Sequence, residues 1–168
     1  MRILGIDPGS SRIGYGLIIK EKGKETLEKY GLIEIKTPDK NQKLFDLYHA
    51  YHKLLKEVKP DRVGVENLYF YKNTKTMLEV AQARGVIILT TLLENLPVFE
   101  LNPKEVKLSV TGYGLSDKKA VEKMVKKILK LPDLKAIDDT MDAIAIALTL
   151  SVLTPLDKYQ TSKNNQHK

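Results

Sequence analysis

Apolar residues come in short runs over the first part of the chain, and this pattern predicts strands. The runs Arg2–Asp7, Ile13–Lys20 and Leu27–Lys36 each carry Ile and Leu, and the polar segments DPGSS and EKGKE separate them. The stretch Asn41–Val58 instead places apolar residues three and four positions apart, which predicts an amphipathic helix ending before Pro60.

The rest of the chain alternates strand-like and helical stretches. Three strands in a row followed by this alternation predict an α/β fold, with a mixed five-stranded sheet flanked by helices. Within the long helix, Ala81 and Gly85 are small and four positions apart, so a second helix could approach closely there. The predicted elements are strands at Arg62–Glu66 and Pro97–Leu101, and helices at Thr74–Leu96, Lys104–Val110, Asp117–Lys130 and Asp138–Leu153.

Length and composition narrow the class of protein. A chain of 168 residues predicts a single domain, here residues 1–154, followed by a polar segment at 155–168 that we expect to be disordered. The sequence has no cysteine, which excludes disulfides and thiolate metal sites. It also has no secretory or membrane-spanning pattern, so we expect a cytoplasmic protein. A net charge of +7 favours a polyanionic partner such as a nucleic acid.

Two predicted strands end on a carboxylate. Asp7 ends RILGID and Glu66 ends RVGVE. Asp7 also precedes a Pro-Gly turn, and a plain hairpin turn would account for that acid alone. In open α/β sheets, however, sites form beyond the carboxyl ends of the strands. If the two strands are neighbours, the acids meet.

The last predicted helix starts with three more acids. Asp139 and Asp142 are three positions apart and Asp138 and Asp142 four apart, so either pair shares a helix face. Capping and the helix dipole would explain one acid at the start of the helix. They explain Asp142 poorly, because it leads directly into the apolar stretch AIAIAL. The spacing alone leaves open whether Asp138 or Asp139 belongs to a site.

Four converging carboxylates would repel one another unless a cation neutralised them. Oxygen ligands select hard ions such as Mg²⁺ or Mn²⁺, and two such ions about 4 Å apart clamp a phosphodiester for hydrolysis. A basic chain with an acid cluster therefore predicts a nuclease. The histidines offer no competing site: His49 and His52 have no acid or Cys partner at ligand spacing along the helix, which predicts surface residues, and His167 lies in the polar tail.

These segments resemble the RuvC family of crossover (Holliday) junction endodeoxyribonucleases. The resemblance is carried in order by GIDPGSSRIGYG, VGVENLYFYKN, AQARGV, PKEVKLSVTGYGLSDKKAVEKMV and DDTMDAIAIAL. It implies an RNase H-like fold, a homodimer, and Mg²⁺-dependent paired nicking of four-way DNA junctions in recombination and repair. Two Mg²⁺ ions per site are implied, with Mn²⁺ as a substitute, and the RuvA–RuvB branch-migration machinery as a partner.

The resemblance also assigns residues. It places the four metal-binding acids on Asp7, Glu66, Asp139 and Asp142, and so selects Asp139 over Asp138. It places DNA-contacting lysines on Lys107 and Lys118, with Lys119 and Lys123 as supporting basic residues. Tyr69 stands where the family commonly has Phe, as the aromatic residue expected to stack on junction bases; Phe70 beside it leaves the register open.

Three other functions fit parts of the sequence. GIDPG resembles the first phosphate loop of actin-like ATPases, but no second glycine-rich phosphate loop follows Leu101. Another RNase H-like nuclease would act on RNA-containing substrates, and a non-catalytic DNA-binding module would have no need of the four acids. Metal-dependent cleavage of a four-way junction distinguishes these alternatives.

Overall fold

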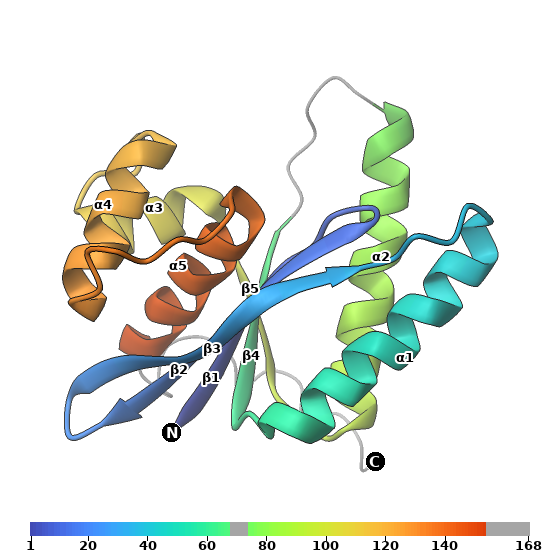
Figure 1. Ribbon diagram of the computed structural model, residues 1–168, viewed down its shortest axis with the longest axis horizontal. Helices are drawn as coiled ribbons and strands as arrows, with labels where there is room; N and C mark the ends of the chain where they lie inside the picture. Colours follow the sequence, from blue (N-terminus) through green and yellow to red (C-terminus); the bar gives the residue numbers. More distant parts are fainter. Residues whose placement is uncertain (68–73, 154–168) are drawn as a thin grey trace, which may run out of the picture.

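The computed structural model describes residues 1–67 and 74–153, which form a five-stranded sheet between two layers of helices (Figure 1). The strands are β1 (Arg2–Asp7), β2 (Arg12–Glu21), β3 (Lys24–Glu34), β4 (Arg62–Glu66) and β5 (Val98–Leu101), in the spatial order β3-β2-β1-β4-β5. The first three strands pair antiparallel, whereas β1, β4 and β5 are parallel. The sheet is therefore mixed, as predicted, with β1 at its centre.

Helices cover both faces of this sheet. α1 (Lys40–Val58) and α2 (Thr74–Leu93) lie on one face, and α5 (Asp138–Val152) lies on the other, covered by α3 (Pro103–Thr111) and α4 (Lys118–Leu129) (Figure 1). Each face has its own buried core. Leu4 and Ile6 of β1 pack toward α1 and α2, while Ile3 packs toward α5. This alternation along β1 sends Asp7, like Ile3 and Gly5, toward the α5 face.

Glycines on β1 and β2 let α5 lie directly against the sheet. A Cβ on Gly5 would stand 2.1 Å from the carbonyl oxygen of Ala143, and one on Gly14 would stand 1.9 Å from the carbonyl oxygen of Asp139. Gly16 faces the same helix, where a Cβ would stand 2.6 Å from Ile144 Cγ1. A side chain at any of these positions would push α5 outward. This glycine seam (Gly5, Gly14 and Gly16) fixes the first turn of α5 beside the end of β1.

The predicted elements are confirmed, with small differences at their ends. The long helix ends at Leu93, three residues before the predicted Leu96. Asn95 adopts a left-handed conformation (φ 57°), which stops the helix there. No helix in the described part of the chain is both long and apolar enough to cross a bilayer. The predicted disordered tail at 155–168 lies outside the described residues, as does Tyr69.

Candidate active site

The ends of β1 and β4 bring two acids to one edge of the sheet. The strands are parallel neighbours, with Ile6 paired to Val65, so Asp7 and Glu66 follow at the same level. Both acids line one cavity of about 380 Å³, together with Asp142 of α5. The sequence-based expectation that the two strand ends meet is therefore confirmed in the geometry.

The start of α5 adds two further acids. Asp139 and Asp142 both raise the pKa of Asp7 through their charge, which places them beside it. The first turn carries no side-chain cap, since the residue at the N-cap is Ile137. Asp138 points outward, with 82% of its side chain exposed, against 35% for Asp139. The structure thus brings Asp139, rather than Asp138, to the cluster.

Burial and mutual repulsion make protons bind tightly to the two strand-end acids. Loss of hydration raises the pKa of Asp7 to about 8, and the charges of Glu66, Asp142 and Asp139 add to this shift. Burial likewise raises the pKa of Glu66 to about 7, with the Asp142 charge contributing. Near neutral pH both carboxyls are therefore partly protonated, and a bound cation could replace the proton.

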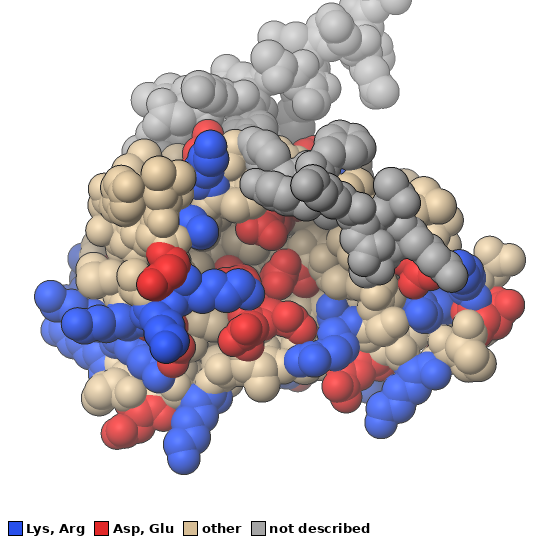
Figure 2. All heavy atoms as spheres, turned by 90° about the horizontal axis from the view of Figure 1, so that it is seen from above, with Lys and Arg blue, Asp and Glu red and all other residues tan. Residues whose placement is uncertain are grey.

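Two lysines border the cluster. Lys118, the first residue of α4, places its Nζ 3.2 Å from Asp142 Oδ2 and 3.8 Å from Asp138 Oδ2. Partial burial lowers the pKa of Lys118, but the charge and hydrogen bond of Asp142, together with the charges of Asp138 and Asp7, outweigh this and the pKa is raised. Lys107 of α3 lines the same cavity and lowers the pKa of Glu66. Figure 2 shows acidic side chains in a hollow with basic side chains on either side.

The donor set fits a hard divalent cation. Carboxylate oxygens are the ligands that Mg²⁺ and Mn²⁺ prefer, and the raised pKa values show how unfavourable this cluster is without a compensating positive charge. Within residues 1–67 and 74–153, no three acidic or histidine side chains close into a complete metal site.

Two arginines at the site were missed from the sequence. Arg84 of α2 donates from Nε to the backbone carbonyl of Glu66 at 3.1 Å and from Nη2 to Asn67 Oδ1 at 2.9 Å. It also pairs with Glu100 of β5, so it holds the end of β4 from the α2 side. Arg12, at the start of β2, places Nη2 3.4 Å from Asp139 Oδ2. Arg84 could have been found from the sequence, because it is a charged residue in the otherwise apolar second half of α2.

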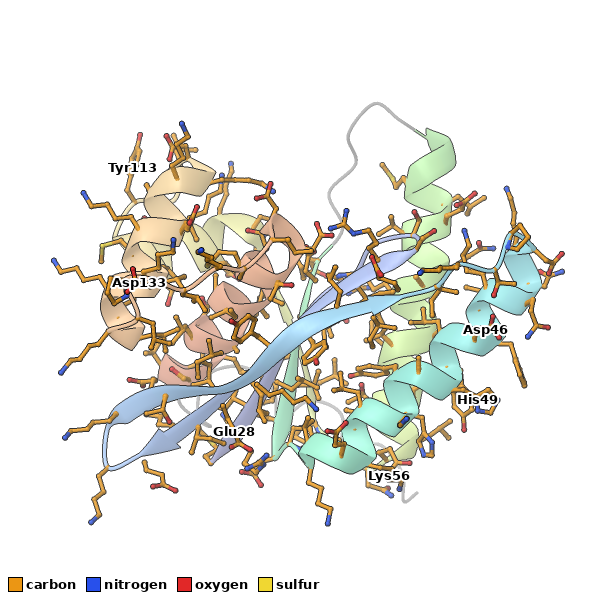
Figure 3. The ribbon with its side chains drawn as sticks, viewed as in Figure 1. Glu28, Asp46, His49, Lys56, Tyr113 and Asp133 are labelled. Atoms are coloured by element: carbon orange, nitrogen blue, oxygen red, sulfur yellow. The ribbon has the colours of Figure 1, made fainter. Side chains whose placement is uncertain are left out.

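The remaining predicted residues lie away from the acids. Lys119 and Lys123 are exposed on α4 and do not line the cavity. His49 is exposed on the outer side of α1, as predicted (Figure 3). His52, in contrast, does have an acid partner: its Nε2 lies 2.8 Å from Glu94, which follows α2. The sequence could not show this contact because His52 lies on α1 and Glu94 lies 42 residues further along the chain, just after α2.

The comparisons with known proteins agree with this geometry. The family model described as crossover junction endodeoxyribonuclease RuvC matches residues 3–150. The chain belongs to the RuvC family. A RuvC crossover junction endodeoxyribonuclease of Thermosipho melanesiensis is 44% identical over 158 residues, which cover 92% of this chain and 99% of that protein.

Solved RuvC structures show the same fold. Thermus thermophilus RuvC superposes with a TM-score of 0.80 at 28% identity, covering 90% of this chain and 93% of that one. T. thermophilus RuvC in complex with a Holliday junction substrate also gives a TM-score of 0.80, at 26% identity and with the same coverage. The RNase H-like fold expected from the sequence is therefore confirmed.

Proposed function

We propose that this chain is a structure-selective endonuclease that resolves Holliday junctions by paired, symmetric nicks in strands of like polarity. The observation that carries the proposal is the four-acid cluster at the meeting point of β1, β4 and α5, bordered by Lys107 and Lys118, in a chain of the RuvC family. Acidic residues that served only to keep the surface solvated would not have to gather at one point. The biological setting that fits this activity is recombination and DNA repair.

In this proposal Asp7, Glu66, Asp139 and Asp142 hold two Mg²⁺ ions, with Mn²⁺ as a substitute. Bound metal would supply an activated water and stabilise the leaving oxygen of the cleaved phosphodiester. Glu66 keeps its position because Arg84 fixes the backbone of its strand end. The Lys107 and Lys118 side chains border the acids on one side, where they can hold a DNA phosphate against the repulsion of the carboxylates.

Paired nicks require two active sites, which a two-fold homodimer supplies. A row of exposed apolar residues along α2 supports such an interface: Leu78, Ala81, Gly85, Leu89 and Leu92 follow one another at helical spacing. Among the residues that the structure describes, none outside α2 places an atom within 4 Å of the Cβ position of Gly85, so the helix surface is open there. A second copy of α2 could approach closely at Ala81 and Gly85.

Two further features of the proposal rest on family resemblance. Tyr69 would stack on bases at the centre of the junction; it lies outside the described residues. The RuvA–RuvB branch-migration machinery would deliver the junction. Both follow from the motifs shared with the family, and the DNA substrate agrees with the junction complex of T. thermophilus RuvC.

Cleavage of three substrates tests the proposal. The protein should nick a four-way DNA junction in the presence of Mg²⁺, should fail to do so in EDTA, and should leave duplex DNA and an RNA/DNA hybrid largely intact. Preferred cleavage of the hybrid would indicate an RNase H-like enzyme acting on RNA-containing substrates. Junction binding without cleavage under any divalent metal would indicate a non-catalytic module.

A further inference from the structure

A second cavity adjoins the acid cluster at Asp7, separate from the one that contains the two lysines. It has a volume of about 360 Å³. Its walls are the turn between β1 and β2, together with Val80 of α2 and Asp139 of α5. The two cavities share Asp7 alone among their lining residues. The acids therefore stand between two hollows, and only the lysine-lined one is used in the function proposed above.

The turn that forms this cavity is built tightly. A Cβ on Gly9 would lie 2.2 Å from the carbonyl oxygen of Arg12, so only glycine allows the chain to close there. Ser10, Ser11 and Arg12 then line the cavity. Lys43 of α1 reaches the turn and donates from Nζ to Ser11 Oγ at 3.0 Å. Arg12 therefore lines this hollow, and the ammonium of Lys43, from another element, contacts one of its lining serines.

Arg12 is held only loosely by the protein itself. Its contact with Asp139 is 3.4 Å long, and 53% of the Arg12 side chain and 35% of the Asp139 side chain are exposed. Exposed ion pairs of this kind contribute little to stability. A guanidinium carries five N–H donors in a planar fork that matches two phosphate oxygens. The pair with Asp139 engages Nη2 at 3.4 Å, and Arg12 lines the cavity beside Asp139.

We propose that the segment Gly9–Arg12 binds a backbone phosphate of the cleaved strand, adjacent to the scissile phosphate. This inference rests on the proposed function and adds a second anchoring point to it. A DNA strand that crosses four carboxylates is repelled along its path, so it needs cations on both sides of them. Lys107 and Lys118 serve one side, and Arg12 with Lys43 serves the other.

Junction binding in EDTA tests this without any cleavage. We expect Arg12→Ala to weaken binding of a four-way junction by about tenfold, as for the loss of a charge-assisted hydrogen bond. The slope of log K against log salt should fall by about 0.9, because one phosphate contact is lost. Arg12→Lys should restore most of the slope. The matched control is Lys24→Ala, which removes one exposed positive charge at the start of β3, and should change neither quantity.

Uncharged methylphosphonate linkages locate the contact. A single methylphosphonate is placed in turn at each linkage that flanks the scissile phosphate. At one of these positions, the substitution should weaken binding by the wild-type protein but not by R12A. A wild-type salt slope in R12A, or an equal methylphosphonate effect in both proteins, would overturn the proposal and leave Arg12 as a partner of Asp139 alone. A wild-type protein with no preference for four-way over duplex DNA would instead contradict the proposed function, so the two can fail separately.

Discussion

At the scale of single residues, the site is defined by acids placed where their charge is costly. Asp7 follows a fully buried strand, and its pKa of about 8 reflects both that burial and three neighbouring carboxylates. The charge of Lys118, which also pairs with Asp142, offsets part of this cost, while Arg84 fixes the end of β4. A bound metal ion would compensate the repulsion among these carboxylates, which explains why they are placed together.

Replacing single acids separates binding from chemistry. Asp142→Asn should lower the rate of junction cleavage by at least about a hundredfold, in the range reported for loss of one charge-stabilising group, while junction affinity changes little. The matched control is Asp138→Asn, which removes the same charge from an exposed side chain on the same turn of helix. Cleavage rates and gel-shift affinities measure the two effects. A D142N protein that cuts at the wild-type rate would remove Asp142 from the site.

The pKa of Asp7 also predicts a stability effect with a definite sign. A carboxyl whose pKa is higher in the folded protein than in the unfolded chain loses stabilisation as pH rises from about 4 to about 8. In EDTA at pH 8, the free energy of unfolding of Asp7→Asn should therefore exceed that of wild type by an amount on the order of 1–3 kcal/mol. The variant should accordingly unfold at a higher temperature. At pH 4 the two proteins should unfold at nearly the same temperature.

Thermal unfolding by circular dichroism measures this difference, with D138N as the control of equal charge change. Added Mg²⁺ should stabilise wild type more than D7N, because only wild type keeps the full ligand set. Metal affinity should fall as pH drops below about 7, where protons occupy Asp7 and Glu66. A D7N protein less stable than wild type at pH 8 without metal would contradict the raised pKa of Asp7.

At the scale of elements, the decisive feature is the close contact of α5 with β1 and β2. The glycine seam removes the side chains that normally separate a helix from a sheet, and it brings the carbonyl of Asp139 against Gly14. The acids of α5 are then positioned by backbone packing, and side-chain flexibility contributes only the last adjustment. The site is consequently as rigid as the contact between α5 and the sheet.

Gly14→Ala tests this contact. Its new methyl group would start 1.9 Å from the Asp139 carbonyl oxygen, so α5 must shift. We expect a loss of about 1–3 kcal/mol of stability from overpacking and a larger proportional loss of cleavage, since Asp139 moves away from Asp7. Gly114→Ala is the control, because its nearest neighbour would stand at an ordinary 3.4 Å. Unchanged unfolding temperature and cleavage in G14A would show that the seam tolerates a side chain.

The elements themselves followed from the sequence, because periodicity and turn residues act locally. The strand-end acids could also be predicted, since parallel strands bring their carboxyl ends together. The choice of Asp139 over Asp138 could not be derived from spacing, because it depends on how α5 is rotated against the glycine seam. Arg12 and His52 were missed as partners for the same reason: each contacts an acid on another element.

At the scale of the whole molecule, the exposed apolar row on α2 leads to a test of the proposed dimer. A Cβ at Gly85 would meet no atom of the described residues within 4 Å, and Gly85 lies on an exposed face of α2, so the fold should be retained in Gly85→Leu. In a close helix pair the same side chain clashes, and association should weaken by about 1–3 kcal/mol. Sedimentation should show monomers, and single nicks should outnumber paired nicks.

The control is Lys127→Leu, which adds a leucine at an exposed position of α4 on the other side of the sheet. It should leave the sedimentation behaviour unchanged. A G85L protein that is folded and still fully dimeric would place the interface on a surface other than α2.

The position of the exposed apolar row on α2 also determines how the rate of cleavage depends on protein concentration. α2 carries the apolar surface and, through Arg84, also holds the strand end that bears Glu66. Pairing of two copies and the alignment of each nicking centre therefore involve the same helix. On dilution below the dissociation constant of the dimer, paired nicking by the proposed enzyme should change from first-order to second-order dependence on total protein concentration. Its product should then change from a resolved duplex to a junction cut on one strand, an intermediate that ligase can reseal.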